Sequence, residues 1–265
     1  MLTRLWSEWR TNFIRKESQV KLRSLPATAV TMFLLGSVGL AFAKEPASQP
    51  VDNGSFSVLV NGQKVASETF SVEQSTNGST ATSQLRDESS PDKASQSSKM
   101  QLTASGELIR YEWHESSPGK TQLEVVPNDQ FLMERVTSNP GEKPAEQPFL
   151  LPASTVILDN NFFIHRELLT WRYLAQNCKQ DSGKMQCIAG PISFGTIVPQ
   201  DRTSMRVTLE PVGNEKVHIR GAERDLPRFN LKFEGGEWAL WLDAADHYKL
   251  IKIAIPAEKT EVVRD

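Results

Sequence analysis

The chain has few of the residues that mark chemistry, with two cysteines and four histidines among 265 residues. It contains no G-x-S-x-G, G-x-G-x-x-G or H-E-x-x-H segment, no P-loop and no EF-hand loop. The common signatures of hydrolases, nucleotide-binding proteins and zinc enzymes are therefore absent. From the sequence we assign no catalytic residue, no metal ligand and no cofactor.

An excess of basic residues is also missing. The whole chain has 30 Lys and Arg against 32 Asp and Glu. The first 43 residues hold six of the basic and two of the acidic residues, so the remainder has a net charge of minus six. Because nucleic-acid binding relies on basic patches that neutralise phosphates, we expect no nucleic-acid partner.

One long apolar run is present, ATAVTMFLLGSVGLAFA at residues 27–43. It follows a basic segment and ends in the small-x-small triplet Ala41-Phe42-Ala43, which predicts a signal peptide cleaved after Ala43. The run is shorter than the roughly 20 apolar residues of a spanning helix. The alternative is that residues 27–43 stay uncleaved as an inner-membrane anchor. In both cases the rest of the chain is expected to be exported, either to the periplasm or as a secreted protein.

The two cysteines, Cys178 and Cys187, flank the turn-forming residues 181–183. In an oxidising compartment this spacing predicts one disulfide across a hairpin. A metal or redox pair is the alternative, but the spacing is not C-x-x-C and no further ligand lies nearby.

The segment after the leader has the pattern of a β protein. We expect residues 44–53 to be a linker and residues 54–265 to form a single β-rich domain. Asn61-Gly62 between two alternating segments is a strong hairpin signal. Polar stretches at 87–98 and 139–148 are expected to be loops. The predicted strands are Ser55–Val60, Lys64–Val72, Met100–Thr103, Glu107–His114, Thr121–Val126, Gln130–Thr137, Met205–Pro211, Lys216–Gly221, Phe229–Phe233, Glu237–Leu242 and Tyr248–Ile253.

One helix is predicted at about residues 161–175, with Asp159 or Asn160 as its N-terminal cap. Its apolar residues recur at intervals of three and four. They are Ile164, Leu168, Trp171 and Leu174. The short connections between strands favour an antiparallel meander, and the helix is expected to lie on the concave face of that sheet.

Three segments carry a resemblance: LDNNFFIHRELLTWRY at 158–173, IVPQD at 197–201, and WLDAADHYKLIKIAIPAEKTEVVRD at 241–265. They resemble a group of uncharacterised bacterial exported β-rich proteins, which is similar to the periplasmic lipoprotein-carrier (LolA-like) half-barrels. The resemblance implies a mainly β fold: a single curved antiparallel sheet, or half-barrel, with one covering α-helix. That group has no activity that could be transferred to this chain.

Large aromatic side chains on the helix and the C-terminal strands are candidates to line an apolar cavity. They are Phe162, Phe163, Trp171, Trp238 and Trp241. The alternative is that they form the core, because aromatic residues also dominate ordinary cores.

Three functions are compatible with the sequence. The first is a periplasmic binding module for a hydrophobic or lipid-like ligand, and the second is a non-enzymatic structural or interaction protein of the cell envelope. The third is an enzyme that uses His165 with carboxylates assembled by the fold. The expected contact with a membrane is through an uncleaved leader.

Overall fold

The computed structural model describes residues 48–88, 95–117, 119–181, 184–187 and 190–265. The predicted leader, residues 1–43, lies outside the described residues. Residues 46–265 form one compact unit. The first strand, β1 (Gln49–Val60), begins inside the segment 44–53 that was predicted as a linker.

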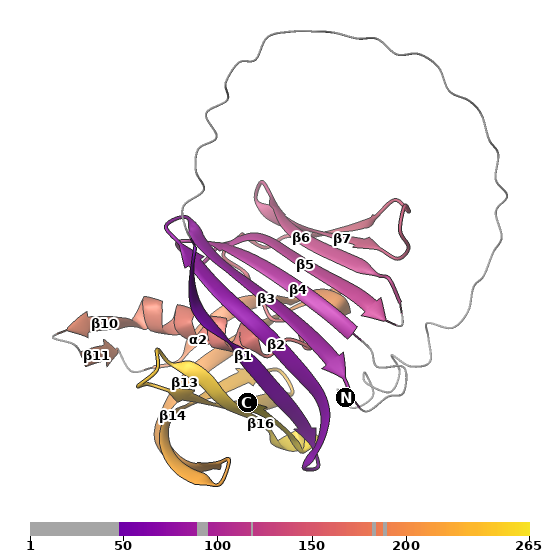
Figure 1. Cartoon of the computed structure of the whole chain (residues 1–265). Helices are drawn as coiled ribbons and strands as arrows, with labels where there is room; N and C mark the ends of the chain where they lie inside the picture. The colour runs from indigo at the N-terminus through magenta and orange to yellow at the C-terminus, as the bar shows by residue number, and fades with distance from the viewer. Residues whose placement is uncertain (1–47, 89–94, 118, 182–183, 188–189) are drawn as a thin grey trace, which may run out of the picture. The chain divides into compact units, whose positions relative to one another are not determined.

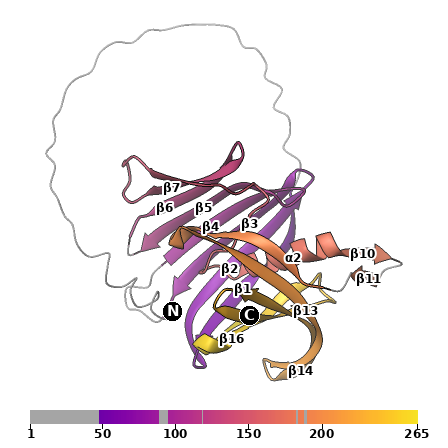
Figure 2. The ribbon, with the colours of Figure 1, turned by 180° about the vertical axis from the view of Figure 1, so that it is seen from behind.

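Fifteen strands form one open, curved sheet, which confirms the mainly β class predicted from the sequence. Their order is β8-β7-β6-β5-β4-β3-β2-β1-β17-β16-β15-β14-β13-β12-β9, and every pair is antiparallel except β9 with β12. Figure 1 and, from behind, Figure 2 show β1 to β7 side by side in sequence order. The bounds after β1 are β2 Gln63–Ser75, β3 Gly78–Asp87, β4 Ser95–Thr103, β5 Leu108–Ser117, β6 Gln122–Asn128, β7 Phe131–Thr137, β8 Ala145–Phe149, β9 Val156–Ile157, β12 Ile192–Val198, β13 Thr203–Ile219, β14 Ala222–Phe233, β15 Gly236–Asp243, β16 Lys249–Ile255 and β17 Thr260–Arg264.

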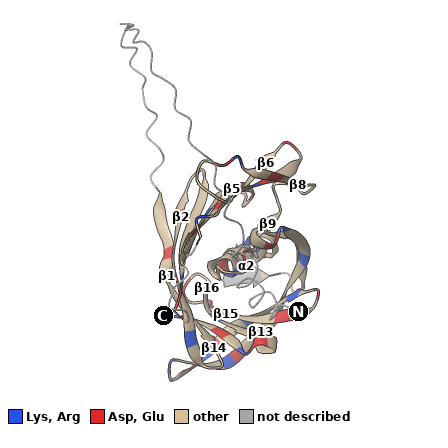
Figure 3. Cartoon of the chain, turned by 90° about the vertical axis from the view of Figure 1, so that its right-hand side faces the viewer, with Lys and Arg blue, Asp and Glu red and all other residues tan. Residues whose placement is uncertain are grey.

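The remaining elements are α2 Ile164–Asn177, the two-stranded hairpin β10 Cys178–Asp181 and β11 Lys184–Cys187, and the 3-10 turns η1 Pro199–Asp201 and η2 Pro256–Glu258. Helix α2 lies inside the curve of the sheet (Figure 3). Acidic and basic residues are both spread over the strands in that view. No helix in the described part of the chain is long and apolar enough to cross a membrane.

The hairpin turn predicted at Asn61-Gly62 is present in the structure. Asn61 and Gly62 both have positive φ, 52° and 78°, as a two-residue hairpin turn between twisted strands requires. The strand β1 then pairs with β2 on one side and with β17 on the other, so the first and last strands of the sheet domain are neighbours.

Three strand predictions need correction. Residues 95–98, predicted as loop, begin β4, because their polar side chains Gln96 and Ser98 are buried in the concave face. Residues 145–149, also predicted as loop, form β8, and Pro148 is tolerated there because β8 is an edge strand. The two strands predicted between residues 205 and 221 are one strand, β13, with an irregularity between Pro211 and Gly213.

Candidate functional site

The N-terminal end of α2 is held by a carboxylate from the sheet. Glu68 of β2 is fully buried, and it accepts hydrogen bonds from the N–H of Phe163 at 2.6 Å and of Ile164 at 3.4 Å. The hydroxyl of Ser83 donates a third bond at 2.6 Å. Burial raises the pKa of Glu68 to about 7, and these hydrogen bonds oppose the shift. Glu68 thus satisfies N–H groups that a helix leaves without intrahelical partners.

Asp159, predicted with Asn160 as the helix cap, lies instead at the centre of a buried polar cluster. Its carboxylate accepts hydrogen bonds from the hydroxyl of Tyr111, from the amide of Gln200 and, at 2.7 Å, from the backbone N–H of Asn161. The N-cap position of α2 is Phe163, three residues beyond Asn160 and four beyond Asp159, and it makes no side-chain capping bond. Burial raises the pKa of Asp159.

Arg166, in the first turn of α2, is fully buried beside this cluster. Its guanidinium donates to the backbone carbonyl of Asp159 and, at 2.8 Å, to that of Phe162. The cation also lies 4.7 Å from the ring centroid of Trp238. Burial lowers the pKa of Arg166 to about 10, so the side chain stays charged at neutral pH.

His165 is buried, with 1 % of its surface exposed. Its Nδ1 accepts a hydrogen bond from the backbone N–H of Asp159 at 3.3 Å, and its ring packs edge-on against Tyr111. Burial is the main cause that lowers its pKa to about 3, so the imidazole is neutral at physiological pH. These contacts attach the helix to the strand β5 and to the segment before α2.

A second buried cluster connects α2 to β1, β16 and β17. The guanidinium of Arg264 bonds the carboxylate of Asp52 and lies 3.1 Å from Glu167. Glu167 also accepts the N–H of Leu250 at 2.7 Å, and the ammonium of Lys249 lies 3.4 Å from Asp52. Burial, reinforced by the nearby Asp52, raises the pKa of Glu167 well above its ordinary value.

A third buried carboxylate, Glu134 on β7, is less well satisfied. The guanidinium of Arg202 lies 3.3 Å from its Oε1, but neither carboxylate oxygen has a hydrogen-bond partner among the described residues. Burial raises the pKa of Glu134 to about 7. No group of three or more His, Cys, Asp or Glu side chains in the described part could hold a metal ion.

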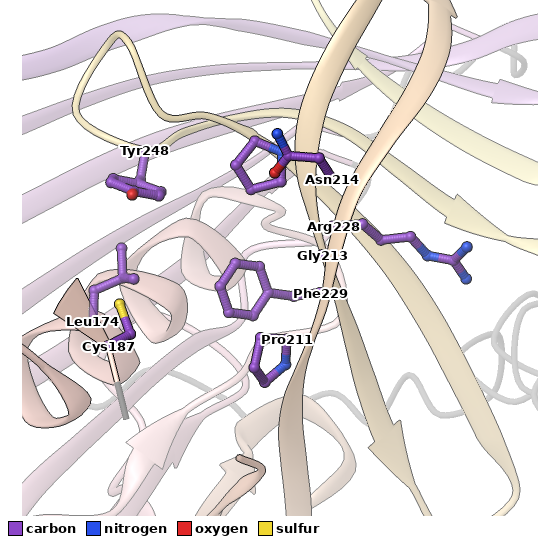
Figure 4. A pocket seen from close by; sticks show the side chains of 9 residues that line it. Leu174, Cys187, Pro211, Gly213, Asn214, Arg228, Phe229 and Tyr248 are labelled. Atoms are coloured by element: carbon purple, nitrogen blue, oxygen red, sulfur yellow. The ribbon is translucent and has the colours of Figure 1, made fainter. Parts of the chain in front are cut away.

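A cleft of about 190 Å³ lies beside the C-terminal end of α2 (Figure 4). We call it the main cleft. In Figure 4 the side chains of Leu174 and Phe229 face each other across it, whereas Arg228 points away, where it bonds Glu215 at 2.8 Å. The cleft thus offers mostly apolar surface. Its lining consists of Leu174, Cys187, Pro211, Gly213, Asn214, Pro227, Arg228, Phe229 and Tyr248.

A second, more enclosed cavity of about 100 Å³ lies where α2 meets the strands β1 to β3. We call it the side cavity. Leu168 and Trp171 line it from the helix, and Val51, Val72, Gln74 and Ser79 line it from the strands.

The five aromatic residues predicted to line a ligand cavity are not brought together. Phe162, Phe163 and Trp238 are buried in the main core, and Trp171 alone of the five lines one of the two cavities. Trp241 belongs to a separate apolar cluster with Ile219, Leu226 and Ile251. Because side chains alternate along a strand, Trp238 and Trp241 of β15 face opposite sides of the sheet. The prediction that Trp241 lines the space under the helix is therefore corrected.

The disulfide predicted from cysteine spacing is confirmed. Cys178 and Cys187 are bonded and stand directly opposite each other in the β10–β11 hairpin. Cys178 is the C-cap residue of α2, and Cys187 lines the main cleft. The hairpin therefore holds one wall of the cleft next to the end of the helix.

Sequence reasoning missed Glu68, Asp52, Phe229 and Tyr248 as residues of these sites. Tyr248 could have been noticed from the sequence only because it lies at a turn. An isolated charged residue in a strand, such as Glu68, is ordinarily expected to face solvent. Comparison of the chain with protein-family models, with curated proteins and with solved structures finds no match.

Proposed function

We propose that this protein is an exported binding module for the apolar part of a small hydrophobic or lipid-like molecule. The observation that carries the proposal is the main cleft, about 190 Å³ in volume and lined largely by apolar side chains. An apolar cavity of about 150 Å³ is large enough to bind benzene in a protein. The leader predicted from the sequence supports export.

The volume of the cleft narrows the class of ligand. Pockets for drug-sized molecules have about 300–1,000 Å³, so the main cleft fits a short alkyl chain or one ring, and a headgroup would remain outside. A complete lipid under α2 would require the helix to leave the concave face. That movement would break the contacts of Glu68 and Glu167 with buried partners.

Calorimetric titration with hexanoate tests the proposal. We expect binding with a negative heat-capacity change, because apolar surface leaves water. The variant Leu174→Phe, which fills the main cleft, should abolish the binding heat. Leu168→Phe makes the same change on the same helix but at the side cavity, and it should leave hexanoate binding intact.

The result that contradicts the proposal is the absence of heat at several temperatures in a protein with the circular dichroism of a folded β protein. The filled concave face then favours the alternative of a structural or interaction protein of the cell envelope. The observation behind that alternative is the dense packing of Phe162, Ile164 and Leu169 under the sheet, each at most 1 % exposed.

A further inference from the structure

The main cleft and the side cavity both border helix α2. Leu168 and Trp171 line the side cavity, and Leu174 lines the main cleft. Trp171 is three residues from Leu168 and three from Leu174, so it neighbours both on the helix surface. Leu168 and Leu174 are separated by about 9 Å along the helix axis.

One hydrogen bond joins the walls of the two spaces. The indole N–H of Trp171, which lines the side cavity, donates to the backbone carbonyl of Tyr248 at 3.1 Å. Tyr248 lines the main cleft. The Trp171–Tyr248 bond therefore lies at the boundary between the two spaces.

The turn that supplies Tyr248 is held in a strained conformation. His247 and Tyr248 have φ values of 54° and 56°, in the left-handed region that bulky residues rarely adopt. Strained residues persist when neighbouring contacts hold them, and they cluster at ligand clamps and switches. The turn is closed by its own backbone bonds, among them that from the N–H of Tyr248 to the carbonyl of Asp243 at 2.8 Å. The Trp171 bond adds to these, and so do the bonds of Leu250 to Glu167 and to Arg264.

We propose that the Trp171–Tyr248 hydrogen bond is a gate that sets the length of the apolar chain this protein accepts. This inference rests on the proposed function. With the bond intact, a ligand is limited to the main cleft. With the bond broken, the ring of Trp171 is released from Tyr248 and the two spaces join. Their combined volume, close to the lower limit of about 300 Å³ for ligand pockets, then accepts a longer unbranched chain.

The variant Trp171→Phe tests the gate, because it removes the N–H donor and keeps an aromatic ring. Hexanoate and dodecanoate are titrated into the wild-type protein and the variant by calorimetry. We expect unchanged affinity for hexanoate and a gain for dodecanoate of up to about tenfold, the equivalent of one net hydrogen bond. Trp113→Phe is the matched control, because it removes an indole bond to Gln96 that borders neither space.

A second variant gives an independent measurement if Trp171→Phe does not fold. Dodecanoate reaches the side cavity of the wild-type protein only by breaking the Trp171–Tyr248 bond. Leu168→Phe fills that cavity, so it should weaken dodecanoate binding and leave hexanoate binding unchanged. Equal effects on both chain lengths in either variant overturn the gate, although the proposed function stands as long as hexanoate binds. Failure of hexanoate to bind the wild-type protein removes the proposed function and, with it, the gate.

Discussion

Glu134 offers the sharpest test of the energetics of this fold, because its carboxylate is buried without a hydrogen-bond partner among the described residues. Burial raises its pKa from 4.5 to about 7. The folded state therefore binds a proton more tightly than the unfolded state, and stability is lost as the pH rises from 4.5 through 7. For these two pKa values, the loss between pH 5 and pH 8 is about 2.5 kcal/mol.

The variant Glu134→Gln removes this titration and keeps the shape of the protonated acid. We expect its free energy of unfolding, relative to that of the wild-type protein, to increase by about 2.5 kcal/mol between pH 5 and pH 8. Urea denaturation at four or five pH values measures the difference. Because the comparison is between two proteins, the titrations of Glu68 and Glu167 contribute equally to both and cancel.

Glu146→Gln on the adjacent strand β8 controls for the loss of one negative charge at an exposed position. If the unfolding free energies of Glu134→Gln and the wild-type protein run parallel across this pH range, Glu134 is not held in a low-dielectric site and the reasoning is wrong.

Three further outcomes are expected. Trp171→Ala should lower the free energy of unfolding by about 1–3 kcal/mol. This is less than the loss for a fully buried tryptophan, because Trp171 is half-buried and borders the side cavity. A loss below about 0.5 kcal/mol in urea denaturation, the range of surface substitutions, would show that the ring does not pack there. Thiol labelling of the denatured, unreduced protein should find neither Cys178 nor Cys187 reactive, and two labelled thiols would disprove the bond. Between pH 7 and pH 4, the wild-type protein should lose up to about 3 kcal/mol more stability than His165→Gln. The reason is that only the unfolded state of the wild-type protein protonates this imidazole in that range. Matching acid denaturation curves would contradict the burial of His165.

Local sequence patterns were sufficient for the elements whose shape depends on nearby residues. The Asn61-Gly62 turn requires backbone angles that these two residues adopt readily, so the first hairpin was predictable. The disulfide was predictable because turn formers lie between two closely spaced cysteines. Short connections between strands predicted an antiparallel sheet, since parallel strands require long crossovers.

Patterns were misleading where polar residues are buried. Gln96 and Ser98 read as loop residues, yet they belong to a strand whose polar side chains are covered from the concave side. Gln96 accepts bonds from the indole of Trp113 and the amide of Asn161, so its burial is compensated. No alternation of apolar and polar residues reveals such partners in advance.

The sequence by itself determined a β-rich chain with one amphipathic helix and a disulfide hairpin, because strand alternation, turn residues and cysteine spacing act through the local backbone. Only the tertiary structure decided which distant groups meet. Glu68 reaches the N–H of Phe163 across 95 residues, and Leu174, Phe229 and Tyr248 form one cleft although they come from three different parts of the chain. The physical reason is that burial and hydrogen-bond partners depend on how the whole sheet curves around α2. That curvature is the sum of the fourteen pairings between its fifteen strands rather than a property of any single segment.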